Sequence, residues 1–371
     1  MGISNGARKP RLRDWLKADP ELAVRFERVR SFSHTVHASE YHLTNACNLR
    51  CKGCWFFVND FDKATSEVGD LAALRSFVKR ERERGVNSAL LIGGEPTLVP
   101  KRVSVYVEEM TYVNISTNGL RPLPREGFEN VTVAVTLFGG GPLDDELRGI
   151  LPNGRSTSGL FEQALGNYRG DPRTIFIFAL TESGIKHIEP TVARIADNGN
   201  LVTFNFYSAY GTNDPIRLDQ GHALLDEALR VRELYPDTVT SHPYYISTMI
   251  TGKSHWDSFS YEVCPSISVA HPGHAVRRRN GNPTLPGFNA WAADLQTVEF
   301  CCTSGQCADC RDSQAVLSWL LVSARKFFDT PEHLRLWVEI AESYWRQLYW
   351  SPFHPARRRG DLAAAAIGSA P

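Results

Sequence analysis

Apolar positions along the chain form short continuous runs separated by stripes with helical spacing. Some of the runs, such as Ile175–Leu180, are apolar on both faces, which is typical of parallel strands covered by helices. The strand-like runs are Tyr41–Leu43, Ser88–Ile92, Tyr112–Thr117, Val131–Leu137, Thr174–Leu180 and Leu201–Tyr207. The alternation predicts an α/β fold, a partial parallel (β/α)6 barrel, and favours it over a sandwich.

The helical stripes have recognisable start and stop signals. Asp70 precedes a helix from about Leu71 to Arg84, which Gly85 ends, with Leu71 and Leu74 expected on its buried face. Further helices are expected at Pro20–Arg30, Glu189–Asn198, Gly221–Tyr235, Ser313–Phe327 and Pro331–Leu348. The last helix has an aromatic stripe that predicts packing rather than a binding face.

These patterns divide the chain into four parts. Residues 1–37 form an N-terminal helical segment, and residues 38–211 form the barrel. Residues 212–356 form a cysteine-rich, loop-and-helix extension, which has little periodicity between its first helix and Gly287. Residues 357–371 are rich in Arg, Ala and Gly and predict a disordered tail.

Composition narrows the class of protein. The hydrophobic content of 42% and charged content of 22% are typical of soluble globular chains. Because 41 basic residues balance 41 acidic ones, no overall field favours nucleic acid or a membrane surface. No apolar run approaches the length of a membrane span, and no secretory signal follows the basic N-terminus. We therefore expect a cytoplasmic protein whose eight cysteines serve metal ligation or catalysis before disulfides.

A cysteine triplet follows the first strand-like run. Cys47, Cys51 and Cys54 have the spacing that can hold three irons of a four-iron cluster and leave the fourth iron open. A zinc site or a loose group of thiols remains an alternative, although structural zinc takes four ligands and this segment offers three thiolates. A disulfide pair would leave one thiol over.

A second motif, Gly93-Gly94-Glu95-Pro96, directly follows the run Ser88–Ile92. Two glycines allow the backbone to approach a ligand closely and to present N–H and C=O groups to it. Glu95 adds a charge, and Pro96 stiffens the exit from the turn. A Gly-Gly turn alone is a weak signal of a ligand site, because such turns often only end a strand. Its position one strand after the cysteine triplet makes the combination of the two motifs a specific signal.

With these two motifs, the chain from about Ser39 to Gly211 resembles the radical S-adenosylmethionine (SAM) enzyme superfamily. The resemblance implies that the cysteine triplet holds a [4Fe-4S] cluster whose open iron binds the amino and carboxylate groups of SAM. It implies that Gly93, Gly94 and Glu95 hold the methionine end. Gly53 stands where the family usually has an aromatic residue, and Trp55 follows the third cysteine.

The resemblance also suggests polar residues at the carboxyl ends of the strands, where parallel barrels bind ligands. Ser116, Thr117 and Asn118 would lie near the ribose or carboxylate of SAM, and Thr136 and Asn205 would point to the same end. Ordinary strand-end hydrogen bonding is the alternative reading of all five residues.

A second group of cysteines lies in the extension. It resembles the auxiliary-cluster extensions of the superfamily (SPASM and the shorter twitch type), without the full seven-cysteine pattern. The resemblance implies a second [4Fe-4S] cluster held by Cys264, Cys302, Cys307 and Cys310. A four-cysteine zinc knuckle and unligated thiols remain alternatives. Which of Cys301 and Cys302 is the ligand is open, and the other is a candidate hydrogen-atom donor.

The resemblance implies an enzyme that cleaves SAM to a 5′-deoxyadenosyl radical and abstracts hydrogen from carbon, with a flavodoxin- or ferredoxin-type electron donor. The expected substrate is a small molecule: a natural-product precursor, sugar, nucleotide or amino acid. Cys47 comes too early to leave room for the N-terminal domain that peptide-modifying members often have. A ribosomal-peptide maturase, an adenosylhopane-synthase-like transferase, and a non-catalytic iron–sulfur or zinc protein are the alternatives.

Two weaker groups are candidates for the substrate site. His271, His274 and Arg277–Arg279 form a basic loop, for which a solvated arginine run is the alternative reading. Tyr244–Tyr245 and His255–Asp257 lie in the aperiodic segment and are candidates to line the site.

Overall fold

The computed structural model describes residues 12–206, 221–258, 268–273, 287–299 and 311–357. Cys264, Cys301, Cys302, Cys307 and Cys310 all lie outside these ranges, as do His274, Arg277–Arg279 and the predicted tail beyond residue 357. Within the described ranges, no helix combines the length and the hydropathy that a membrane crossing needs.

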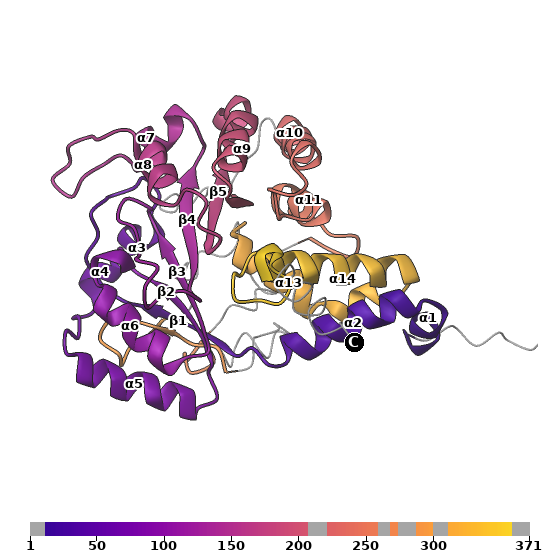
Figure 1. The fold of residues 1–371 in the computed structure, drawn as a ribbon, viewed down its shortest axis with the longest axis horizontal. Coiled ribbons are helices and arrows are strands. Elements are labelled where there is room, and N and C mark those ends of the chain that lie inside the picture. The colour runs from indigo at the N-terminus through magenta and orange to yellow at the C-terminus, as the bar shows by residue number, and fades with distance from the viewer. Residues whose placement is uncertain (1–11, 207–220, 259–267, 274–286, 300–310, 358–371) are drawn as a thin grey trace, which may run out of the picture.

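The described strands form one sheet with the order β6-β5-β4-β3-β2-β1-β7-β8, and β1 to β6 are all parallel. Figure 1 labels β1 to β5 of this sheet. The strands are β1 Ala38–His42, β2 Ser88–Ile92, β3 Tyr112–Thr117, β4 Thr132–Phe138, β5 Thr174–Leu180, β6 Leu201–Phe206, β7 Ala290–Trp291 and β8 Val298–Glu299. The predicted parallel strands are confirmed, with bounds that differ by few residues.

Helices cross over between most consecutive parallel strands and cover the outer face of the sheet. They are α3 Trp55–Val58, α4 Phe61–Ala64, α5 Leu71–Glu83, α6 Pro100–Glu109, α7 Pro142–Arg148, α8 Leu160–Asn167 and α9 Ile188–Asp197, with short 3-10 helices at Pro96–Leu98 and Glu182–His187. The Asp70 side chain caps α5 by accepting from the Ala72 amide, as its position in the sequence predicts. The prediction that Leu71 is buried is wrong, because its side chain at the first turn is 38% exposed.

Strand β1 shows how the two faces of the sheet differ. Tyr41 points outward into the core, where its ring packs on Tyr106 of α6 and Phe77 of α5. Glu40 and His42 alternate with it and therefore point to the inner face. Glu40 lines the same internal cavity as Asn205 of β6, although β1 and β6 stand at opposite ends of the six parallel strands. The sheet thus curls into the partial barrel that the sequence predicts.

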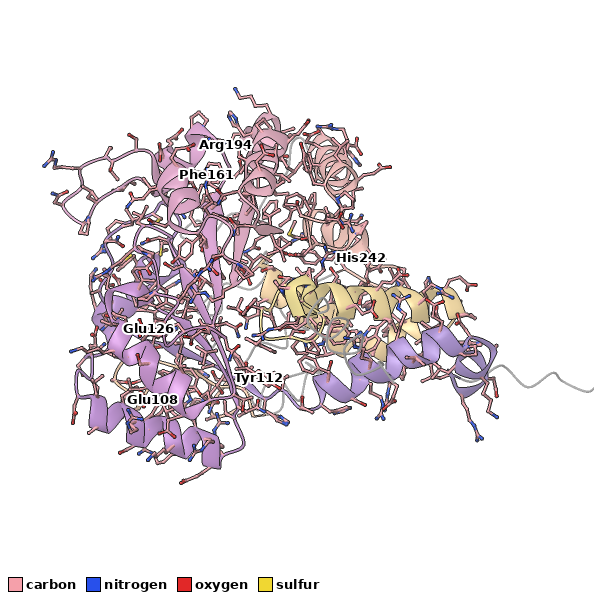
Figure 2. The ribbon with its side chains drawn as sticks, viewed as in Figure 1. Glu108, Tyr112, Glu126, Phe161, Arg194 and His242 are labelled. Carbon is pink, nitrogen blue, oxygen red and sulfur yellow. The ribbon has the colours of Figure 1, made fainter. Side chains whose placement is uncertain are left out.

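The N-terminal and C-terminal helices pack together beside the sheet (Figure 1). They comprise α1 Leu12–Ala18, α2 Pro20–Ser33, α10 Gly221–Leu234, α11 Pro243–Thr251, α13 Ser313–Val322 and α14 Pro331–Arg346, with a 3-10 helix at Ala324–Phe327. Arg25 of α2 forms an ion pair of 2.8 Å with Glu342 of α14. Tyr112 at the start of β3, labelled in Figure 2, stacks on Trp350 and ties this helical layer to the sheet.

Candidate functional site

An internal cavity of about 320 Å³ opens on the inner face of the barrel. The described residues that were predicted to hold the cluster or SAM all line it: Cys47, Cys51, Cys54, Gly93, Gly94, Glu95, Ser116, Thr117, Asn118, Thr136 and Asn205. They come from the loop after β1, the turn after β2 and the ends of β3, β4 and β6. The parallel strands bring these segments together, because their carboxyl ends lie along one edge of the sheet.

The Gly-Gly turn and the cysteine loop are packed backbone to backbone. The amides of Gly94 and Glu95 donate hydrogen bonds of 2.8 Å each to the carbonyls of Thr44 and Ala46. Gly93 has a φ of +118°, in the region that favours glycine. A β-carbon on Gly94 would lie 2.0 Å from the Ala46 carbonyl oxygen. Both glycines therefore serve first to seat the cysteine loop.

The other side of the cysteine loop rests on the end of α7. The amides of Arg50 and Lys52 donate hydrogen bonds of 2.7 Å to the carbonyls of Ile150 and Leu147. The Arg50 guanidinium also lies 3.9 Å from the centre of the Phe57 ring and donates to the Cys47 carbonyl. The loop is thus held on both sides before any cofactor binds, which pre-organises its thiols.

The three thiols are largely withdrawn from water and are not joined by disulfides. Burial raises the pKa of Cys47 and of Cys51 to about 12 each, and it also raises the pKa of Cys54. Raised pKa values favour the protonated thiols, and a bound metal supplies the positive charge that favours the thiolates. The donor set therefore fits a metal centre with thiolate ligands.

A single zinc ion would need its ligand sulfurs close together. In a tetrahedral site with Zn–S bonds of about 2.3 Å, the sulfurs lie about 3.8 Å apart. Among the described residues, only His255, Asp329 and His333 form a group of three whose ligand atoms all lie within 4.8 Å of one another. The three cysteine sulfurs do not form such a close group, so the triplet as it stands lacks the spacing of a single tetrahedral zinc site.

The carboxylate of Glu95 is buried and already bonded within the protein. Its Oε1 accepts from the Thr97 amide at 3.0 Å and from the hydroxyls of Thr97 and Thr117 at 2.7 Å each. Its Oε2 accepts from the backbone N–H of Asn118 at 2.8 Å. Glu95 thus joins the turn after β2 to the end of β3, so its principal visible role is to position the residues around it.

The predicted polar residues at the strand ends differ in whether their side chains already form hydrogen bonds within the protein. Asn118 donates to Asn48 of the cysteine loop at 2.6 Å, whereas Ser116 and Thr136 are half-buried and face the cavity. Asn205 donates to Asp312 at 3.1 Å and accepts from the Ser313 amide at 2.8 Å. Its side chain fixes the start of α13 over the barrel.

Arg148 is a cavity residue that sequence reasoning missed. It is 1% exposed, lies at the end of α7, and its Nε is 3.0 Å from Oδ1 of Asp144, which is equally buried. Its Nη2 donates to the Asn118 carbonyl, but its Nη1 has no hydrogen-bond partner among the described residues. A buried guanidinium nitrogen without a partner is costly unless an anion meets it. The i, i+4 spacing of Asp144 and Arg148 is the signal that could have marked this pair.

Glu40 and His42 were missed in the same way. Both are buried on the inner face of β1, and neither Glu40 Oε1 nor His42 Nε2 has a hydrogen-bond partner among the described residues. The rings of Trp55 and Phe61 pack around His42 at 5.5 and 5.3 Å. Glu40 directly precedes the strand-like run Tyr41–Leu43, and a charged residue beside such a run is the sequence signal for this position.

The weaker predicted groups lie away from the cavity. Tyr244 and His255 bond to each other at 2.7 Å, and Trp256 packs on Trp319. Tyr245 donates to the Phe204 carbonyl at 2.9 Å. They pack α11 against its neighbours, and none of them lines the cavity, so the structure gives their predicted place in a substrate site no support.

The close group of His255, Asp329 and His333 is explained without a metal. The two imidazole rings stack at 4.0 Å, and both nitrogens of His255 face other partners, the Tyr244 hydroxyl and the Lys326 carbonyl. An imidazole in this arrangement presents no free nitrogen to a shared ion.

No family model and no curated protein matches this chain. Among solved structures, "Native anSMEcpe with bound AdoMet and Cp18Cys peptide" is similar at a TM-score of 0.45 and 15% identity, covering 62% of this chain and 70% of that one. Streptococcus suis SuiB bound to the precursor peptide SuiA gives 0.42 and 16%, covering 60% and 54%. HydG, a maturase of the [FeFe]-hydrogenase, gives 0.39 and 10%, covering 96% and 89%. At these scores, the similarities do not by themselves assign an activity to this chain.

Proposed function

We propose that the chain is a radical SAM enzyme whose cysteine triplet holds a [4Fe-4S] cluster. The observation that carries this proposal is the convergence of Cys47, Cys51, Cys54 and the Gly93–Glu95 turn on one cavity at the carboxyl edge of a parallel sheet. A merely structural metal site would need neither the cavity nor the turn. When bound, the cluster and SAM supply a 5′-deoxyadenosyl radical that abstracts hydrogen from substrate carbon.

The chain's own residues then have distinct tasks. The turn at Gly93 and Gly94 brings the backbone against the loop that bears the thiols, and Glu95 holds this turn to Asn118. The unpartnered Nη1 of Arg148 offers a cationic donor for the methionine carboxylate. The floor of the cavity is apolar at Leu90, Ile92, Ala134, Ile177 and Ala179, which keeps water away from a reactive radical.

The later cysteines are proposed, as the resemblance implies, to hold an auxiliary [4Fe-4S] cluster in the extension of residues 212–356. A small molecule remains the proposed substrate, a flavodoxin- or ferredoxin-type protein the proposed electron donor, and the cytoplasm the proposed location. A peptide substrate is the second candidate, and the described residues contain no observation that favours it.

Metal analysis after anaerobic reconstitution with iron and sulfide tests the proposal against a zinc or non-catalytic protein. We expect about eight irons per chain if both clusters form and about four if only the first does. Cys47→Ala, Cys51→Ala and Cys54→Ala should each remove the first cluster, while Cys307→Ala and Cys310→Ala should spare it. Stoichiometric zinc that resists replacement by iron would contradict the proposal.

A further inference from the structure

The inner end of the cavity contains a carboxylate that the proposed cofactors do not explain. Glu40 stands on β1, ahead of the cysteine loop, and its side chain is 1% exposed. Its Oε1 lies 3.9 Å from Nε2 of His42, which is too long for a hydrogen bond, and neither atom has another partner among the described residues. Glu40 lines the cavity and therefore faces the space that a ligand would fill.

A second carboxylate faces the same space from the other edge of the barrel. Asp312 caps α13 by accepting from the backbone N–H of Gln314 at 2.9 Å. Its second oxygen accepts from the side chain of Asn205 at 3.1 Å. Burial raises the pKa of Glu40, the nearby His42 opposes this, and the charge of Asp312 raises that pKa further. The two carboxylates thus line one cavity, and neither has a cation among its hydrogen-bond partners in the described residues.

The charges around these two groups do not cancel. Glu299 of β8 adds a third carboxylate near His42, and burial raises the pKa of Glu299 while His42 opposes that shift. Arg148 lines the cavity on the side of the cysteine loop, where Cys51 donates to its carbonyl. The Arg311 guanidinium lies against Gly252 instead, and Arg311 is not a cavity residue. Of the three carboxylates, Glu40 and Asp312 line the cavity, and among the described residues the one cavity-lining guanidinium, that of Arg148, lies on the other side.

We propose that the space between Glu40 and Asp312 binds a protonated amino group of the substrate, so that the substrate is a small molecule with an ammonium group. The inference rests on the function proposed above and names its substrate class. An ammonium ion donates up to three hydrogen bonds and would give Glu40 Oε1 the partner it lacks. The apolar floor between this end and the thiols would then take the carbon skeleton, which places its C–H bonds toward the SAM side.

Binding of matched probes tests the proposal on the reconstituted 371-residue chain, without turnover. n-Butylammonium and its neutral analogue 1-butanol are compared by ligand-observed NMR under anaerobic conditions. We expect the ammonium to bind about tenfold more tightly or better, because hydrogen bonds to a buried charge are among the strong ones. Equal binding of the two probes would overturn the proposal.

Three variants sharpen the test. Glu40→Gln should abolish the preference for the ammonium while iron content and SAM binding stay as in the wild type. Asp312→Asn keeps an amide oxygen that can cap α13, so it should reduce the preference even if Glu40→Gln folds poorly. Glu126→Gln alters an exposed glutamate (Figure 2) and should change nothing.

Other outcomes separate this inference from the proposed function. If Glu40→Gln lost SAM binding in parallel with ammonium binding, these carboxylates would serve the cofactor, and the inference would be wrong. A capped lysine peptide that bound more tightly than the free amines would overturn the assignment to a small molecule. Ammonium preference in a protein that binds no SAM would instead leave this site standing and remove the proposed function.

Discussion

The α-carbon of Gly94 faces the carbonyl oxygen of Ala46 so closely that a β-carbon would lie 2.0 Å from that oxygen. Gly94→Ala should therefore push the cysteine loop out of place and lower the iron content after reconstitution by about half or more, since misplaced ligands bind metal poorly. Iron and sulfide analysis measures this. Gly166→Ala is the matched control, because a β-carbon there meets nothing within 4 Å, and that variant should keep its iron.

Glu95→Gln tests whether this carboxylate positions the turn. The amide nitrogen of glutamine would replace one of the two oxygens that accept hydrogen bonds. The lost acceptor would be either the one that meets Thr97 and Thr117 or the one that meets the backbone N–H of Asn118. We expect the free energy of unfolding in urea to fall by about 1–3 kcal/mol, the cost of an unsatisfied buried group. Glu126→Gln serves again as the control. Unchanged stability in Glu95→Gln would show that the bonds to Glu95 contribute little.

Arg148 and Asp144 form a buried ion pair. Removing one charge should lower the free energy of unfolding, and removing both should restore most of it. Arg148→Met leaves the Asp144 carboxylate buried without its counter-charge and should cost about 3–5 kcal/mol of unfolding free energy. The double variant Asp144→Asn/Arg148→Met should regain most of this stability. It should still bind SAM more weakly, as measured by equilibrium dialysis, because the guanidinium is absent. Normal SAM binding by the double variant would exclude Arg148 as the carboxylate partner.

His354 predicts a pH dependence of stability. Burial lowers the pKa of this histidine from 6.5 to about 4, with Arg346 and Arg357 adding to the shift. Below pH 6.5, the unfolded chain takes up a proton that the folded chain does not, so stability falls as the pH drops toward 4. The loss is about 1.4 kcal/mol for each pH unit inside this window. Urea unfolding of His354→Gln should show a shallower slope than the wild type between pH 6.5 and pH 5, and an identical slope would refute this account.

The strands of the barrel could be predicted from the sequence because each is a continuous apolar run. Ser88–Ile92 and Thr174–Leu180 match β2 and β5 in full. The two-residue strand β7 was missed, since two residues have no periodicity, although it extends the sheet beside β1. Helix α11 was missed because its buried residues, among them Tyr245, Ile246 and Met249, leave it without a clear polar face.

Some residues of the candidate site could also be predicted from the sequence, and others could not. The cysteine triplet and the Gly-Gly turn could be found because their spacing in the sequence is itself the signal. Glu40 and Arg148 were not found, because their sequence signals are weak and their burial and missing partners become visible only in the fold. Asn205 was found, but the structure shows its side chain bonded to the start of α13. Sequence spacing therefore predicted where the site lies better than it predicted which contacts each side chain makes.

Formation of 5′-deoxyadenosine tests the central claim most directly. The anaerobically reconstituted protein is reduced in the presence of SAM, and the nucleoside is quantified by mass spectrometry beside the Cys47→Ala, Cys51→Ala and Cys54→Ala variants. We predict that the wild type forms 5′-deoxyadenosine and that none of the three variants does. A wild-type protein with its full iron content that forms no 5′-deoxyadenosine under any reducing condition would contradict the claim.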